Sequence, residues 1–262
     1  MNSPGGPMKD RTHALTWKRE GRLAIATMTM PFLQVVRDLS RVDELFEELD
    51  AYEQDTCVDA VLFLSSDDEV APPSTVRGIV EGTQTQARTA PEQGRLSLLR
   101  SFNVLSRLAV RVAEYKKLVA VAWRGTIDPT NLAIGLSAGL RIAAEDVQLN
   151  VIHRDVALPP LGGLSYLLPT YLGLAKAHSV MLKGKPIDAG QALDWGLVDA
   201  VLPMESFSEA TCREAQRLVK TYVDNLHQNF PVVRIDAKIL HDLLLTEMHR
   251  LELLCKDLLP DC

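Results

Sequence analysis

The stretch His153-Arg154-Asp155 places an imidazole two positions from a carboxylate. Histidine titrates near neutral pH, so His153 could take up and release a proton, with Asp155 or the more distant Asp128 acting beside it. A histidine flanked by Arg and Asp at the end of an expected strand is also typical of a solvated loop. We therefore treat His153, Asp155 and Asp128 as candidate catalytic residues and keep the solvated loop as the alternative.

A second candidate site is the sequence Asp128-Pro129-Thr130-Asn131. Asp is a preferred helix N-cap, and Pro suits the first helical position. Such a start would leave the backbone N–H groups of Thr130 and Asn131 free at the positive end of a helix, where an anion can bind. An ionised Asp128 would oppose an anion there, so an ordinary capped helix is the alternative.

Strands and helices alternate along the chain, and this alternation sets where the candidate residues lie. Apolar runs typical of strands cover residues 23–30, 58–64, 118–123 and 147–152. After the first run, Ser40 is the expected cap of a helix whose apolar residues start at Val42 and follow i, i+3, i+4, i+7 spacing. A longer amphipathic helix precedes the third strand, and the last third of the chain is helical. This order predicts an α/β fold with mostly parallel strand pairing.

The segment from Pro159 to Pro203 carries the most specific pattern. A Gly-Gly turn, a short helix, a Gly break and a second helix are followed by a Lys-Gly-Lys-Pro turn. Asp188 then stands at an expected helix N-cap, and Gln191 follows at the spacing of a capping box. Gly196 ends that helix, because the residue after a C-cap commonly needs positive φ. A short apolar strand closes the segment.

This order of elements resembles the region after the active site in the crotonase superfamily of enoyl-CoA hydratases and isomerases, and the resemblance covers about residues 14–245. It implies a crotonase-like α/β fold, a spiral of ββα units with a C-terminal helical region. We expect a disordered head at residues 1–13, the α/β core at 14–203 and the helical region at 204–262. In the family this last region is used in trimer formation, so a homo-trimer or hexamer is implied.

The resemblance also implies a chemistry, the stabilisation of a thioester enolate by two backbone N–H groups from separate loops. The first N–H would come from Ser74 or Thr75, since the two prolines before them have none to donate. The second would come from Thr130, in the helix that follows Gly125. An acyl-CoA or acyl-carrier thioester is the implied substrate, with coenzyme A as part of that substrate and no other cofactor.

The two glutamates used by hydratases of this superfamily have no counterpart at the matching positions. A gapless match aligns Ala133 with the first glutamate and a position near His153 with the second. Glu145 is the one glutamate between Tyr115 and Met204. We therefore expect a noncanonical hydratase- or isomerase-like lyase or isomerase. The alternatives are a catalytically silent subunit that binds an acyl thioester or a partner protein, and an unrelated α/β protein.

Composition excludes several other classes of protein. The net charge of −6 and the isoelectric point near 5.6, without a basic stripe, argue against nucleic-acid binding. No apolar run approaches the roughly 20 residues of a membrane span, and the first residues lack the apolar stretch of a signal peptide. The four cysteines are scattered, which fits free thiols in the cytoplasm rather than disulfides or a metal site. We expect His241 and His249, with Glu247 between them, to be surface residues of a helix.

Overall fold

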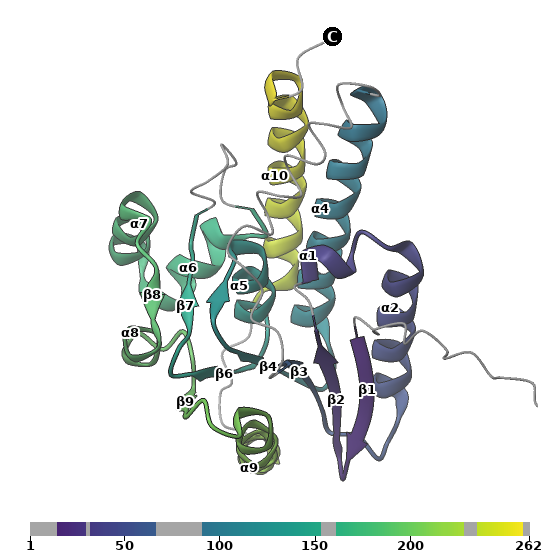
Figure 1. Ribbon diagram of the computed structural model, residues 1–262, viewed down its shortest axis with the longest axis vertical. Helices are drawn as coiled ribbons and strands as arrows, with labels where there is room; N and C mark the ends of the chain where they lie inside the picture. The colour runs from purple at the N-terminus through teal and green to yellow at the C-terminus, as the bar shows by residue number, and fades with distance from the viewer. Residues whose placement is uncertain (1–14, 30–31, 67–90, 153–160, 228–234, 259–262) are drawn as a thin grey trace, which may run out of the picture.

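The protein contains two β-sheets (Figure 1). The computed structural model describes residues 15–29, 32–66, 91–152, 161–227 and 235–258. The larger sheet has six strands in the order β1-β2-β3-β4-β6-β9, and the smaller has three in the order β5-β7-β8. The strands of the larger sheet are β1 (Leu15–Glu20), β2 (Leu23–Met28), β3 (Ala60–Ser65), β4 (Leu118–Trp123), β6 (Leu140–Ala144) and β9 (Ala200–Leu202). Those of the smaller sheet are β5 (Thr126–Ile127), β7 (Gln148–Leu149) and β8 (Ile187–Asp188). The predicted head at residues 1–13 lies outside the described residues.

Pairing in the larger sheet is mostly parallel, as the strand–helix alternation predicts. Only β1 runs antiparallel to its neighbour β2; the pairs β2–β3, β3–β4, β4–β6 and β6–β9 are parallel. In the smaller sheet β5 and β7 are parallel and β8 is antiparallel to β7. The turn from β4 into β5 carries the chain from one sheet to the other, and the candidate site follows that turn.

The two-residue period of the strands divides the apolar residues between two layers. In β4, Val119, Val121 and Trp123 face one cluster of buried residues, while Leu118 and Ala122 face the other. The same division holds in β2, β3 and β6. The sheet is therefore buried on both faces, which is why its strands read as continuous apolar runs.

Helices cover the two faces unequally (Figure 1). Helix α9 packs on β3, β4, β6 and β9 on one face, and the remaining long helices lie on the other, where α10 runs beside α4. The helices are α1 (Phe32–Val35), α2 (Leu39–Gln54), α4 (Pro91–Glu114), α5 (Pro129–Leu136), α6 (Leu164–Leu172), α7 (Leu174–Lys183), α8 (Ala189–Asp194), α9 (Phe207–His227) and α10 (Ala237–Leu258).

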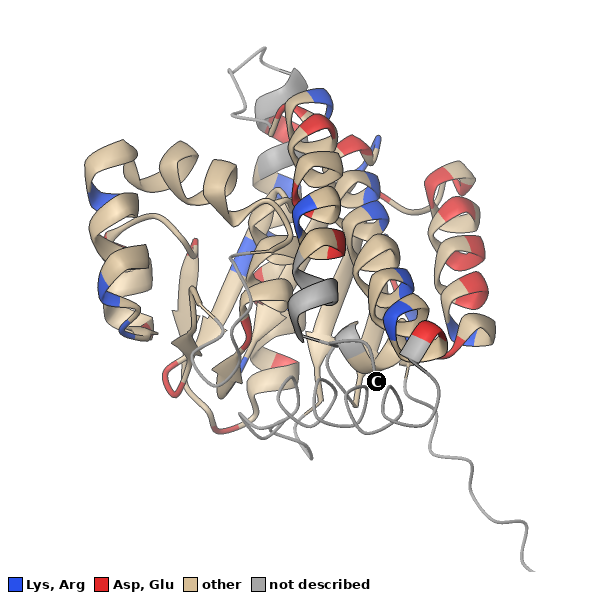
Figure 2. Ribbon diagram, turned by 90° about the horizontal axis from the view of Figure 1, so that it is seen from above, with Lys and Arg blue, Asp and Glu red and all other residues tan. Residues whose placement is uncertain are grey.

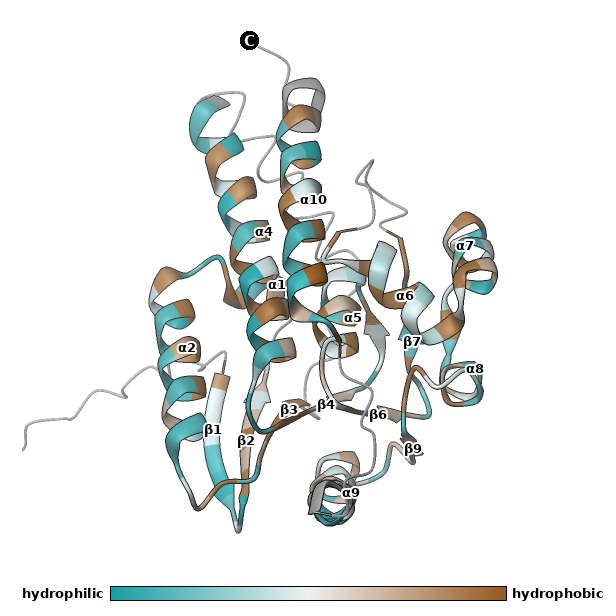
Figure 3. Ribbon diagram, turned by 180° about the vertical axis from the view of Figure 1, so that it is seen from behind, coloured by the Kyte–Doolittle hydropathy of each residue, from teal (hydrophilic) through white to brown (hydrophobic). Residues whose placement is uncertain are grey.

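Sequence patterning explains how these helices sit. Polar and apolar residues alternate around α4 and α10 at helical spacing (Figure 3), and acidic residues line the outer side of α2 (Figure 2). Val42, Leu45 and Leu49 of α2 are buried, as their spacing predicts. Across the described part of the chain, none of the helices combines the length and apolarity needed to cross a membrane.

Several of the predicted element boundaries are wrong. The cap of α2 is Asp38 rather than Ser40: the Asp38 carboxylate accepts hydrogen bonds from the Ser40 backbone N–H at 3.1 Å and hydroxyl at 2.7 Å. Asp and Ser are both good caps and stand two residues apart, so the sequence alone does not decide which of them caps the helix. The first predicted strand stops at Met28, and the run at 147–152 forms only the two residues of β7. The edge strand β1 had no prediction, because most of its residues are polar.

The pattern between Pro159 and Pro203 is confirmed where the structure describes it. Asp188 caps α8 with its carboxylate 2.8 Å from the Gln191 backbone nitrogen. Gly196 follows that helix with φ of 70°. The Gly-Gly turn at Gly162 and Gly163 also has positive φ, of 79° and 84°, which lets the chain turn sharply into α6.

A buried arginine fastens this segment to the sheet. The Arg141 guanidinium on β6 donates to the carbonyls of Ala138 and Leu197, each at 2.8 Å, and pairs with Asp199 at 3.2 Å. It also donates to the Tyr171 hydroxyl at 3.1 Å, and that hydroxyl in turn donates to the carbonyl of Leu136 at 2.8 Å. This chain of bonds links β6, α6, the approach to β9 and the end of α5.

Close contact between α5 and β4 generates a first prediction. A Cβ added at Gly135 would stand 1.9 Å from Cζ2 of Trp123, a buried ring that cannot move aside freely. We expect Gly135→Ala to lower the free energy of unfolding by about 1–3 kcal/mol, as overpacking of a core does. Gly190→Ala in α8 is the matched control, because its Cβ would meet nothing closer than 3.5 Å. Urea denaturation of both variants measures the difference, and equal stabilities would contradict this packing.

Candidate active site

Helix α5 begins as its sequence predicts. Asp128 is the N-cap in extended conformation, and Pro129 occupies the first turn. Thr130 is 2% exposed, so this helix start is buried beneath other elements. The helix begins directly after β5, which places its positive end next to the junction of the two sheets.

The expectation that the first N–H groups of α5 are free is wrong. The Asp128 carboxylate accepts from the backbone N–H of Thr130 at 2.9 Å and of Asn131 at 3.2 Å. It also accepts from the Asn131 side-chain amide at 2.9 Å and from the Thr130 hydroxyl. The reason is the short loop from Asp128 to Asn131, which lets one carboxylate reach every nearby donor. An external anion has to replace Asp128 to reach these N–H groups.

Gly125 lies at the turn between β4 and β5, with φ of 65°. Its N–H donates to the Asp146 carboxylate at 3.1 Å, and its carbonyl accepts from the Gln148 N–H at 2.8 Å. Both backbone groups therefore hold the smaller sheet against the turn. The predicted substrate-binding role of Gly125 has no free backbone donor to use.

Ala133, one turn into α5, is fully buried. A Cβ built on Gly162 would lie 2.7 Å from the Cβ of Ala133, so the Gly162 turn packs closely against Ala133. The contact explains why glycine stands at residue 162 and a small side chain at residue 133. A longer side chain at position 133 would have to extend past this turn.

A carboxyl group that the sequence analysis missed lies on the other side of the same turn. Glu247 of α10 is only 7% exposed, so the expectation that it is a surface residue is wrong. Its carboxylate accepts from the Gly163 N–H at 3.0 Å and from the Ser165 hydroxyl at 3.3 Å. Glu247 thereby caps the start of α6, which has no capping side chain of its own. His241 and His249 are exposed, as expected.

The signal for Glu247 was present in the spacing of α10. Leu240, Leu244 and Leu251 are buried, and Glu247 occupies the third position of this i, i+4, i+7, i+11 stripe. An acidic residue inside an apolar stripe is a buried charge that needs a partner. The partner, the Gly163 N–H, could not be identified from local sequence.

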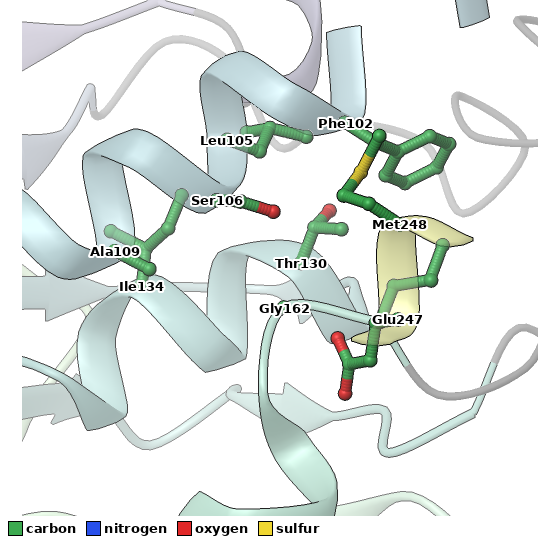
Figure 4. Close-up of a pocket in the computed structure, with 10 residues that line it drawn as sticks. Phe102, Leu105, Ser106, Ala109, Thr130, Ile134, Gly162, Glu247 and Met248 are labelled. Carbon is green, nitrogen blue, oxygen red and sulfur yellow. The ribbon is translucent and has the colours of Figure 1, made fainter. Parts of the chain in front are cut away.

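A small cavity adjoins Glu247 (Figure 4). It has room for about one water molecule. The hydroxyls of Ser106 and Thr130 point toward each other across it, and the Glu247 side chain runs along its wall beside the Gly162 turn. The described residues that line it come from α4, α5, the turn and α10: Phe102, Leu105, Ser106, Ala109, Thr130, Ile134, Leu161, Gly162, Glu247 and Met248.

Burial raises the pKa of the Glu247 carboxyl above its ordinary value. The N–H groups of Gly163 and Gly162, the Ser165 hydroxyl and the charge of Arg250 oppose that rise without cancelling it. Desolvation dominates because the cavity walls from α4 and α5 are mainly apolar. Glu247 can therefore hold a proton at a higher pH than a solvated glutamate does.

The remaining predicted site residues, His153, Asp155, Ser74 and Thr75, lie outside the described residues. Their proposed roles stay predictions. Among the described residues, no group of His, Cys, Asp or Glu side chains is arranged to hold a metal ion.

Comparison with known proteins places the fold and the site in context. A sequence model of the enoyl-CoA hydratase/isomerase family matches residues 24–231. The chain belongs to this family. The predicted crotonase-like α/β fold is confirmed by the solved structure of an enoyl-CoA hydratase from Bacillus halodurans, which superposes with a TM-score of 0.72 over 93% of this chain and 96% of that one, at 16% identity.

Curated relatives of this chain match shorter stretches. The 1,2-epoxyphenylacetyl-CoA isomerase of Escherichia coli is 30% identical over 129 residues, which are 49% of this chain and 48% of that protein. The alpha subunit of the fatty acid oxidation complex of Shewanella frigidimarina is 27% identical over 206 residues, 76% of this chain and 27% of that protein. The chain spans less than half the length of the first curated relatives that it matches.

The raised pKa of Glu247 generates a prediction about stability. A carboxyl whose pKa is higher in the folded protein stabilises the fold below its unfolded pKa, and that contribution is lost as pH rises through the folded pKa. Glu247→Gln cannot ionise, so it escapes this loss while its amide oxygen still accepts from Gly163. We expect the melting temperature of the variant minus that of the wild type to increase from pH 4 to pH 8, as measured by calorimetry. A constant or shrinking difference would show that Glu247 is not a desolvated carboxyl.

Proposed function

We propose that this crotonase binds an acyl-CoA-type thioester beside the start of α5 and moves a proton at the carbon next to the thioester carbonyl, without adding water. Such a protein is isomerase-like rather than hydratase-like. The acidity of that carbon comes from the neighbouring carbonyl, whose oxygen takes the charge of the enolate. Family membership supports the substrate class.

The observation that carries the proposal is the burial of Ala133 under the Gly162 turn. By the family match, this is where a hydratase holds the first of its two glutamates. Two positioned carboxyl groups are needed there to activate a water and to protonate the adjacent carbon. With an alanine in that place, water activation loses one of its two groups. Proton transfer needs only one.

A second candidate function is favoured by the Asp128 contacts. Because Asp128 already occupies the N–H groups of Thr130 and Asn131, an enolate oxygen would meet a negative charge at this helix start. In that case the protein is a catalytically silent subunit that binds the thioester or a partner. The two functions differ in one measurable step, the breaking of a C–H bond in the bound ligand.

This difference gives a direct test. We expect the purified protein to hydrate crotonyl-CoA at a rate near background, because an acid–base group typically contributes about 10²–10⁴-fold. We expect it to exchange the acidic protons of a saturated short-chain acyl-CoA with deuterium oxide, followed by mass spectrometry. Robust hydration would contradict the proposal, and ligand binding without exchange would establish the silent subunit instead.

We further propose that the protein assembles as a homo-trimer or hexamer. The apolar stripes of the C-terminal helices do not by themselves require this, since α9 buries its stripe on the sheet and α10 on α4. What supports assembly is the apolar surface that remains on α10, where Ile239, Leu245 and Leu253 are 51%, 57% and 50% exposed. Exposed apolar residues gathered on one helix favour an interface.

Sedimentation velocity at micromolar concentration tests the assembly. We expect a species three or six times the chain mass of 28.9 kDa. Leu245→Glu would place a charge on the exposed face of α10 and should shift the population toward monomer. A wild-type protein that sediments only as the monomer would rule out this assembly.

A further inference from the structure

We propose that the exposed face of α7 is a contact between two copies of this chain, related by a two-fold axis that passes beside His178. The face consists of Leu174, His178 and Leu182, and we call it the α7 stripe. The inference rests on the assembly proposed above and adds a second, different contact to it. Two trimers joined through their α7 stripes make a hexamer.

Exposure is the first observation that supports this contact. Leu174 and Leu182 are 77% and 79% exposed, more than any other large apolar side chain that the structure describes. His178 between them is exposed as well. The three residues follow one another at intervals of four, so they form a single ridge along the helix. Apolar residues gathered in this way favour an interface over contact with water.

The second observation is how little of α7 its own chain buries. Of its ten residues only Ala177 is buried, and Val180 and Met181 pack partly against the core. The helix leans mainly on α6, at the edge of the molecule (Figure 1). A helix of this length is marginal in water by itself and takes most of its stability from burying an apolar face. A second molecule on the α7 stripe would complete that burial.

The charges around the stripe indicate which molecule fits it. Helical spacing places Lys176 and Lys183 on the opposite side of α7, and the Lys176 ammonium lies over the Trp195 ring at 3.8 Å. The stripe itself therefore presents two leucines and an imidazole, without a carboxylate or an ammonium group. A strongly charged partner has nothing to pair with here. The surface that complements the stripe is uncharged, apolar and of the same length, and another copy of α7 is such a surface.

The stripe is also complementary to itself in shape. It reads leucine, histidine, leucine at equal spacing, so its pattern is the same in both directions. When two α7 helices pack antiparallel about an axis at His178, each Leu174 meets Leu182 of the other copy and the two imidazoles meet at the centre. Ala175 and Ser179 form a row of small side chains beside the ridge, which leaves a groove for the other copy's leucines. Antiparallel helices also place the positive end of one beside the negative end of the other.

The small size of this contact determines the assembly in which it forms. A stable interface buries about 1,200–2,000 Å² in total, which is more than two ten-residue helices sharing three residues each can supply. A trimer held through α10 would carry three α7 stripes, and three weak contacts made together bind far more tightly than one. We therefore expect α7 to join trimers rather than monomers.

Charged substitutions at the axis test the contact, because a residue on a two-fold axis meets its own copy. In sedimentation velocity at micromolar concentration and pH 8, we expect wild type to contain six chains. His178→Glu and His178→Lys should each halve this mass to three chains, since like charges then repel at the centre. An equimolar mixture of the two variants should recover six chains, because each glutamate trimer meets a lysine trimer. A stripe that docks on a different surface would show no recovery, since neither variant changes that surface.

Controls separate the contact from general effects of charge and from loss of the fold. Gln216→Glu and Gln216→Lys change the charge by one unit at an exposed position of α9, which lies away from α7 (Figure 1), and both should sediment like wild type. A double variant, Leu174→Ser with Leu182→Ser, removes apolar surface without adding charge and should also give three chains. Because both leucines are exposed, the circular dichroism of this variant should match that of wild type.

The outcomes distinguish this contact from the proposed assembly through α10. A wild type of three chains, or of six chains that survive both substitutions of His178, would overturn the α7 contact and leave the trimer standing. Variants of three chains that do not recover on mixing would overturn the two-fold geometry. A wild type of two chains, reduced to one by His178→Glu and recovered in the mixture, would support the α7 contact and overturn the trimer. A wild type of one chain would overturn both.

Discussion

The buried guanidinium of Arg141 holds together the elements on which the rest of the site depends. Its planar fork reaches carbonyls before β6 and before β9, the Asp199 carboxylate and the Tyr171 hydroxyl of α6. Because Tyr171 also bonds to the end of α5, the distance between α5 and α6 is set by directional bonds as well as by packing. The Gly162 turn precedes α6, so its pressure on Ala133 follows from this anchoring. The bonds of Arg141 and Tyr171 thereby hold α6 against the end of α5.

Two helix starts near the cavity are each capped by a carboxylate of the same chain, but with different consequences. Asp128, the residue before α5, caps that helix: its carboxylate accepts from the N–H groups of Thr130 and Asn131, so a second anion would have to displace it. Glu247 caps α6 from a distant helix, is buried, and has an elevated pKa. The positive end of a helix stabilises a carboxylate, whereas an apolar wall destabilises it. At Glu247 burial outweighs the hydrogen-bond donors around the carboxylate, so the pKa of that carboxyl is raised.

The sequence alone predicts a structural feature correctly where the interaction that determines it lies within a few residues. Asp188, Gly196 and Asp128 act within a few residues of themselves, and their caps and turns could be predicted. The cap of α2 was misassigned because Asp38 and Ser40 are equally suited by type. Local sequence could not show that the Asp128 carboxylate would accept from both Thr130 and Asn131, since that depends on side-chain geometry. It could not identify Glu247 either, because its partner Gly163 is 84 residues away.

The separation of Glu247 and Gly163 along the chain affects the order in which parts of the protein fold. The wall formed by α10 meets α4 and the Gly162 turn only after a long loop of chain has closed, and the entropy lost in closure rises with the length of the loop. Contacts between distant parts of a sequence slow folding. The central strands can pair through shorter crossovers, so the cavity wall is expected among the last structures to form. An intermediate in which α10 has not docked would contain an intact sheet and a Gly163 N–H without its carboxylate partner.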